Sequence, residues 1–137
     1  MVKYISLTHS SEERLYLKQY TQLIVLDLSK NRITRDAFQE MDFLYLLRKL
    51  DISECELDFL PNQTFWRNRL RLTTLFAHRN RLRMEHMMSL RLAPKLKWLT
   101  LYYNEGCVVP NYRKKIVIMA GYSTRGGGAK TGRKTHF

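Results

Sequence analysis

Apolar positions recur along this chain at a nearly constant spacing. The segment 23–33 reads L-x-x-L-x-L-x-x-N-x-I, and its frame returns from Leu47, Leu72 and Leu96. A degenerate copy begins at Val2, so that the starts are 21, 24, 25 and 24 residues apart. Four or five copies at one spacing are typical of stacked repeats, in which each unit buries its apolar residues against its neighbours.

The centre of each copy predicts a short strand whose leucines point inward, because side chains alternate between the two faces of a strand. Between the strands, helical spacing predicts helices over 35–47 and 84–92, the second of which ends before Pro94, and a short helix over 11–20. A period of about 20–29 residues is that of leucine-rich repeats. We therefore predict the α/β fold class, as a leucine-rich-repeat solenoid of about five repeats. A short parallel sheet would line its concave face, and helices and irregular turns its convex face.

One position of the frame, which follows the strand, is expected to be buried and polar. Asn31, Asn80 and Asn104 fill it, and an amide there can bond backbone groups that the turn leaves unpaired. Cys55 fills the same position in the third copy, where we expect a small buried residue rather than a reactive thiol. The other cysteine is Cys107, and the two have no C-x-x-C spacing. This usage fits a reducing intracellular compartment without a disulfide framework.

Residues between the inward leucines would form the concave face of the sheet. Its first half is expected to be acidic, since Asp27 and Asp51 on neighbouring strands would lie roughly 5 Å apart at the backbone. With no nucleophile or positioned histidine beside them, they are predicted to receive a cation from a partner, and the chain is predicted not to be an enzyme. In the second half, Phe76, Trp98 and Tyr102 would expose an apolar patch, which usually marks a binding surface.

The positive charge is concentrated in the C-terminal part. The chain has 24 Lys and Arg against 12 Asp and Glu, for a net charge of +12, and residues 1–60 sum to −2 whereas residues 61–137 sum to +14. Such asymmetry favours a polyanionic partner, most often a nucleic acid, over a merely solvated surface. Residues 1–119 are predicted to form one repeat domain with a C-terminal cap, and residues 120–137 a flexible, basic, glycine-rich tail. The tail residues expected to contact phosphates are Arg125, Lys130, Arg133 and Lys134.

The sequence gives little indication of a membrane span, a metal site or a phosphate-binding loop. No apolar run approaches the roughly 20 residues of a membrane span, and no metal-ligand spacing relates the histidines to one another or to a cysteine. Residues 127–134 nearly match a phosphate-binding loop but carry Arg133 where lysine is required. We therefore predict no membrane, metal or cofactor partner.

The last repeat leads into a cap motif. Residues 104–113 resemble the cap of intracellular leucine-rich-repeat families, in which an asparagine is followed by a Tyr-Arg pair and an apolar helix, here 112–119. Together with residues 45–50, 72–80 and 96–101, they resemble the A-prime family of the U2 small nuclear ribonucleoprotein. The resemblance implies a nuclear, non-catalytic scaffold in pre-mRNA splicing.

The same resemblance implies partners and the residues that would meet them. Members of the family hold an RNA-recognition-motif protein of the U2 particle by gripping one of its helices in the concave face, and the pair binds a stem-loop of U2 small nuclear RNA. Carried over, the residues facing the partner helix would be Asp27, Asp51, Phe76, His78, Trp98, Thr100 and Tyr102. Those near the RNA would be Arg79, Arg81, Arg83, Arg113, Lys114 and Lys115.

Two other functions fit the same features. A ribosome-associated or other ribonucleoprotein repeat protein would explain the basic half equally well. A protein-only adaptor, such as a phosphatase regulator or an axonemal light chain, would share the repeat and the cap but would not need the positive charge. Salt dependence separates the RNA-binding functions from the adaptor, because affinity carried by phosphate contacts falls steeply with salt.

Overall fold

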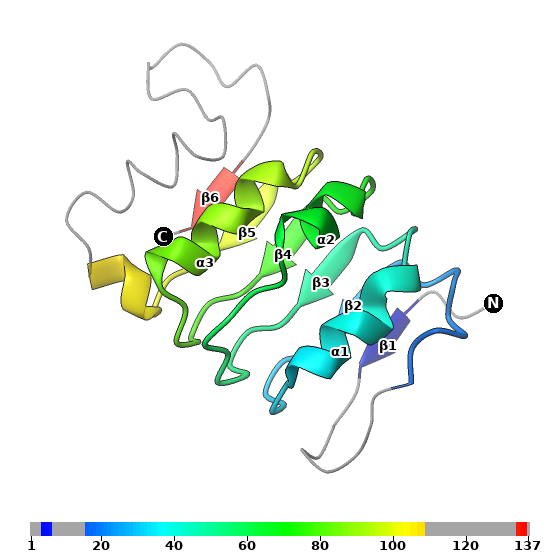
Figure 1. Ribbon diagram of the computed structural model, residues 1–137, viewed down its shortest axis with the longest axis horizontal. Helices are drawn as coiled ribbons and strands as arrows, with labels where there is room; N and C mark the ends of the chain where they lie inside the picture. Colours follow the sequence, from blue (N-terminus) through cyan, green and yellow to red (C-terminus); the bar gives the residue numbers. More distant parts are fainter. Residues whose placement is uncertain (1–3, 7–15, 109–133, 137) are drawn as a thin grey trace.

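The strands form one parallel sheet in chain order. The computed structural model describes residues 4–6, 16–108 and 134–136, with side chains over 16–107. Its mixed α/β architecture and its short parallel sheet agree with the predicted fold class (Figure 1). Each strand has three residues, and the six are β1 Tyr4–Ser6, β2 Val25–Asp27, β3 Lys49–Asp51, β4 Thr74–Phe76, β5 Trp98–Thr100 and β6 Lys134–His136.

The register of the sheet joins equivalent positions of the repeats. Val25 pairs with Lys49, Lys49 with Thr74, and Thr74 with Trp98. The adjacent row, which points into the core, consists of Leu26, Leu50, Leu75 and Leu99. The alignment predicted from the frame is therefore confirmed across β2 to β5.

A tight turn follows each of β2, β3, β4 and β5. The residue just before the frame asparagine or cysteine has a left-handed backbone, with φ between 55° and 61° at Lys30, Glu54, Arg79 and Tyr103. None of the four is glycine, and for L-residues this backbone conformation costs roughly 1–2 kcal/mol. The hydrogen bonds of the buried residue that comes next must offset that cost.

The frame asparagines and Cys55 are buried, as predicted. Nδ2 of Asn80 donates to one carbonyl of the preceding repeat and to one of its own, at 2.9 and 3.1 Å. Asn104 repeats this pattern at 3.0 and 2.8 Å. Cys55 is only 1% exposed, and its thiol donates to the carbonyl of Leu28 at 3.0 Å and to that of Ser53 at 3.2 Å. One small polar side chain thus joins the turns that follow neighbouring strands.

Helices and 3-10 turns cover one face of the sheet (Figure 1). They are α1 Arg35–Glu40, η1 Met41–Phe43, α2 Gln63–Asn68, α3 Met84–Met88, η2 Ser89–Leu92 and η3 Glu105–Val108. The helix predicted over 35–47 ends earlier, at residue 43, because the chain must turn to enter β3. The one predicted over 84–92 is present as α3 followed by η2. None of these described helices is long and apolar enough to cross a membrane.

Two predictions about helices fail or fall outside the structure. The helix expected over 11–20 is absent from residues 16–20, which form turns, while residues 11–15 lie outside the described part. The sequence analysis also missed α2, although Asn62 caps it by accepting a hydrogen bond from the backbone N–H of Phe65 at 3.2 Å. The cap helix expected over 112–119 lies outside the described residues.

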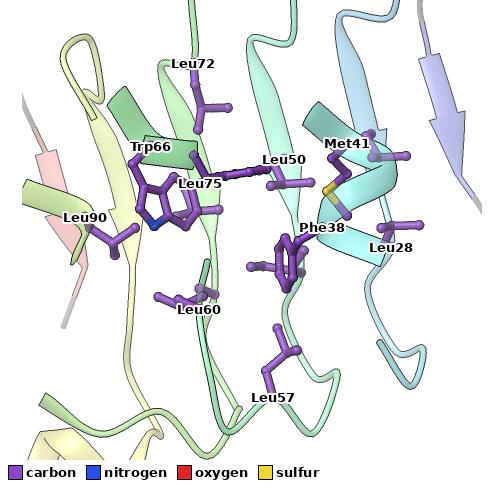
Figure 2. Close-up of a cluster of buried hydrophobic side chains, with 14 of the residues drawn as sticks. Leu28, Phe38, Met41, Leu50, Leu57, Leu60, Trp66, Leu72, Leu75 and Leu90 are labelled. Carbon is purple, nitrogen blue, oxygen red and sulfur yellow. The ribbon is translucent and has the colours of Figure 1, made fainter. Parts of the chain in front are cut away.

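The core fills the space between the sheet and the helices. Figure 2 shows Leu50 and Leu75 pointing from β3 and β4 toward Phe38 of α1 and Trp66 of α2. Trp66 is fully buried, and its indole Nε1 donates to the Ser89 hydroxyl at 3.0 Å, so it links α2 to η2. The core thus packs α1 and α2 on the leucines of the sheet, and Trp66 links α2 to the segment that follows α3.

The last strand contradicts part of the prediction for the tail. Lys134–His136, which the sequence analysis places in a flexible segment, form β6 and pair in parallel with β5. The edge of β5 would otherwise present unpaired N–H and C=O groups, and any extended segment can satisfy them through its backbone. Such pairing needs no apolar pattern, which is why composition did not reveal it.

Candidate functional site

The sheet has one face that carries no helix among the described residues. α1, α2 and α3 lie together on the opposite side (Figure 1). Side chains that alternate with the buried leucines point to this surface. We call it the open face and define it by Asp27, Lys49, Asp51, Phe76, His78, Trp98, Thr100 and Tyr102.

A cluster of rings occupies the second half of the open face. The imidazole of His78 stacks on Tyr102, with centroids 4.4 Å apart and planes inclined by 14°. The ring of Phe76 lies 6.3 Å from that imidazole, and Lys49 Nζ lies 4.9 Å from the Phe76 centroid. Phe76, Trp98 and Tyr102, which were predicted to form an exposed apolar patch, are half-buried. The rings cover part of one another and leave a surface suited to an apolar anchor from a partner.

His78 is held as a neutral ring. Its Nδ1 lies 2.7 Å from the hydroxyl Oγ1 of Thr100, at hydrogen-bonding distance. Burial lowers the pKa of His78, and this effect outweighs the opposing influence of Asp51 and Glu54. At neutral pH the stacked imidazole therefore adds polar edges but no charge to the open face.

Thr100 is poorly placed for the role predicted for it. Only 6% of the residue is exposed, so it cannot offer a contact surface comparable to that of its neighbours. It pairs with His136 of the added strand β6 and shares a hydrogen bond with His78. Its contribution is to position His78 rather than to face a partner.

The two aspartates lie side by side, as predicted, and each is bound by a serine. Asp27 and Asp51 pair in register on β2 and β3. Oδ1 of Asp27 accepts hydrogen bonds from the N–H and hydroxyl of Ser29 at 2.9 and 2.7 Å. Ser53 binds Asp51 in the same way at 3.0 and 2.6 Å. Both carboxylates are thus oriented on the open face, ready to meet a cation.

No metal centre is formed in the part of the chain that the structure describes. Within those residues, no group of three or more His, Cys, Asp or Glu side chains could hold a metal ion.

The three arginines that follow β4 are surrounded by acidic residues. The guanidinium of Arg79 lies 5.1 Å from the exposed ring of Tyr103, and Arg83 Nε is 3.3 Å from Glu105 Oε2. The hollows beside Arg79, Arg81 and Arg83 are also lined by Glu54, Glu56, Asp58, Glu85 and Glu105. Most of these carboxylates belong to other repeats, so the linear run of arginines did not reveal them. They compete with an incoming phosphate for the same cations.

The remaining predicted RNA contacts cannot be placed. Lys134 belongs to β6 through its backbone, and its side chain lies outside the described part. The others outside it are Arg113, Lys114, Lys115, Arg125, Lys130 and Arg133.

Sequence reasoning missed a buried cation on the helical side. Arg69 is 2% exposed and donates to the carbonyls of Met41 and Asp42 at 2.6 and 2.9 Å, and to that of Phe65 at 3.3 Å. Burial lowers its pKa, opposed chiefly by Asp42. The three carbonyls accept hydrogen bonds from the guanidinium, so Arg69 joins the end of α2 to η1 and has a structural role.

The two thiols are expected to differ in reactivity. Burial raises the pKa of Cys55 to about 11, so its reactive thiolate is scarce at neutral pH. Cys107 is half-buried and is more accessible. With Ellman's reagent at about pH 8, the folded chain should show one fast thiol and one slow one, and urea should make both fast. Cys107→Ala should remove the fast phase, and a fast phase that persists in this variant contradicts the assignment.

The comparisons with known proteins concern the fold. No protein-family model matches the chain, and no curated protein matches its sequence. A solved structure of Chaetomium Mex67:Mtr2 subunits is similar, with a TM-score of 0.50 and 16% sequence identity. The match covers 76% of this chain and 77% of that chain. At this identity the likeness extends to the fold alone.

Proposed function

We propose that this chain is a leucine-rich-repeat solenoid and a non-catalytic scaffold of the U2 small nuclear ribonucleoprotein in pre-mRNA splicing, acting in the nucleus. Its open face binds a helix of an RNA-recognition-motif protein of that particle. Its basic half contacts U2 small nuclear RNA. The repeat frame and the cap motif that resembles the A-prime family support this proposal.

The observation that carries the proposal is the pairing of two surfaces on one open face. A ring cluster at β4 and β5 adjoins two oriented carboxylates at β2 and β3. An amphipathic helix with apolar residues near one end and lysine or arginine near the other would match both parts. Catalysis does not need such an arrangement, and a docking scaffold does.

Removal of one ring from the open face should strongly weaken binding of the protein partner. We expect Phe76→Ala or Trp98→Ala to cost about 2 kcal/mol or more of binding free energy, since aromatic side chains near the centre of an interface carry most of its affinity. Isothermal titration with the purified RNA-recognition-motif protein measures the change. Tyr16→Ala is the matched control, because it removes an exposed ring outside the open face. Full affinity in both ring variants, with melting temperatures unchanged, would rule out docking on this face.

Purification of the tagged chain from its own cells tests the assignment to a particle. Enrichment of U2 small nuclear RNA together with an RNA-recognition-motif protein supports the splicing scaffold. Enrichment of ribosomal RNA would instead indicate a ribosome-associated repeat protein. Absence of RNA above background would indicate a protein-only adaptor, the second candidate, which the carboxylates around Arg79, Arg81 and Arg83 favour.

A further inference from the structure

We propose that RNA binds along the edge of the sheet where β3, β4 and β5 begin. This inference rests on the proposal that the basic half of the chain contacts RNA, and it places that contact at the end of the strands opposite the arginines that follow β4. We call this surface the basic edge and define it by Arg48, Arg71, Lys95 and Lys97. All four side chains are exposed.

Backbone hydrogen bonds place these residues side by side. The N–H of Thr73 donates to the carbonyl of Arg48 at 2.9 Å, and the N–H of Lys97 donates to the carbonyl of Thr73 at 2.8 Å. Arg48 and Lys97 therefore flank Thr73 in one row. Arg71 and Lys95 lie two residues before that row, in the turns that lead to β4 and β5. The four cations therefore all lie at the end of the sheet where these strands begin.

The basic edge differs from the arginines after β4 in its lack of ion pairs. None of its four side chains makes an ion pair within the described residues, whereas Arg83 is paired with Glu105. The segments that hold Arg71, Lys95 and Lys97 contain no carboxylate between Asp58 and Glu85, or between Glu85 and Glu105. Unpaired like charges gathered at one end of a sheet repel one another. A bound polyanion removes this repulsion, and phosphate groups along a strand of RNA would meet the cations in series.

An exposed aromatic ring and an exposed aliphatic side chain, in the loops that lead to the basic edge, favour RNA over an acidic protein. Tyr45 is 56% exposed and lies in the loop that leads to Arg48. The guanidinium of Arg69 lies 5.7 Å from the Tyr45 ring. Leu70, 64% exposed, occupies the equivalent position before Arg71. Single-stranded RNA combines phosphates with bases that stack on such rings, which an acidic peptide cannot do.

Two variants with equal loss of charge test the location. R71Q/K95Q/K97Q removes three cations from the basic edge, and R79Q/R81Q/R83Q removes three after β4. Binding of the full chain to fluorescein-labelled single-stranded RNA of mixed sequence is followed by anisotropy over a range of salt concentrations. The edge variant should bind about tenfold more weakly, with a salt slope smaller by about 2, since each lost phosphate contact removes about 0.7. The second variant should stay within about twofold of the unmodified chain.

The outcomes separate this inference from the proposed function. Equal losses in both variants, or a larger loss in R79Q/R81Q/R83Q, would overturn the basic edge while leaving RNA binding intact. Failure of the unmodified chain to bind RNA would overturn the inference and the RNA contact together, but not docking on the open face. If labelled polyglutamate binds as tightly as RNA, and R71Q/K95Q/K97Q weakens it equally, the partner of the basic edge would be an acidic protein and not RNA. Tyr45→Ala should weaken RNA binding several-fold without changing its salt dependence or the binding of polyglutamate. Melting curves of each variant verify that it remains folded.

Discussion

Replacement of Asn80 by alanine is expected to lower the free energy of unfolding by about 3–5 kcal/mol. Asn80 is 8% exposed, and its amide bonds four backbone groups at 3.1 Å or less and the carbonyl of His78 at 3.4 Å. Oδ1 accepts from the N–H groups of Cys55 and Leu57 at 2.9 and 3.1 Å, while Nδ2 donates to the carbonyls of Ile52 and Ala77. A methyl group leaves all four buried groups without this partner, and each unsatisfied buried group costs roughly 1–3 kcal/mol.

Urea unfolding followed by circular dichroism measures this change. Asn68→Ala is the matched control, since it deletes the same amide from an exposed position in α2 and should change stability by less than about 0.5 kcal/mol. Asn104→Ala should lie between the two, because Asn104 accepts from Leu82 and donates to two carbonyls. A loss below about 1 kcal/mol for Asn80→Ala would show that water replaces the amide and that the turn is not held by it.

The sheet could be predicted because the apolar positions that form its strands recur at a regular spacing in the sequence. A spacing of 24 or 25 residues between Leu47, Leu72 and Leu96 is enough to align the strands, since equivalent positions of stacked units must pair. The asparagine position could be predicted for the same reason. Cys55 shows that the position requires a small donor more than an amide, because its thiol also donates to one carbonyl near the preceding strand, that of Leu28, and to one in its own turn, that of Ser53.

Features that depend on side-chain contacts between repeats could not be predicted. The segment that contains α2 has no clear helical spacing, and its signal was the cap residue Asn62 before Phe65. From the sequence alone, Arg69 is expected to be an exposed cation, because the three carbonyls that bind it come from contacts that the sequence does not reveal. The same holds for the arginines after β4, whose acidic neighbours come from other repeats. The strand β6 pairs through its backbone, so its side chains carried no signal.

Replacement of Trp66 by alanine is the second change with a large expected effect. We expect it to cost about 3–5 kcal/mol, the usual loss for a buried tryptophan whose removal leaves a cavity. Trp66 is 0% exposed, and its ring meets Phe65 edge-on at 5.0 Å. Its Nε1 donates to the carbonyl of Pro61 at 3.1 Å and to the hydroxyl of Ser89 at 3.0 Å. One side chain thus joins the start of α2 to η2 in the next repeat, across the core shown in Figure 2.

Two further variants divide this loss into its parts. Trp66→Phe keeps most of the apolar volume but removes the donor. Ser89→Ala removes a hydroxyl that accepts from the indole and donates to the carbonyl of His86 at 2.8 Å. If cavity formation dominates, each should cost about 1–2 kcal/mol in urea unfolding followed by circular dichroism, clearly less than Trp66→Ala. If Trp66→Phe is as damaging as Trp66→Ala, the hydrogen bonds of the indole hold the two repeats together instead. In Trp66→Ala and Trp66→Phe, Trp98 is the one remaining tryptophan, so its fluorescence reports whether the end of the sheet at β5 unfolds together with α2 or separately. A single coincident transition is expected because the buried apolar residues form one core cluster.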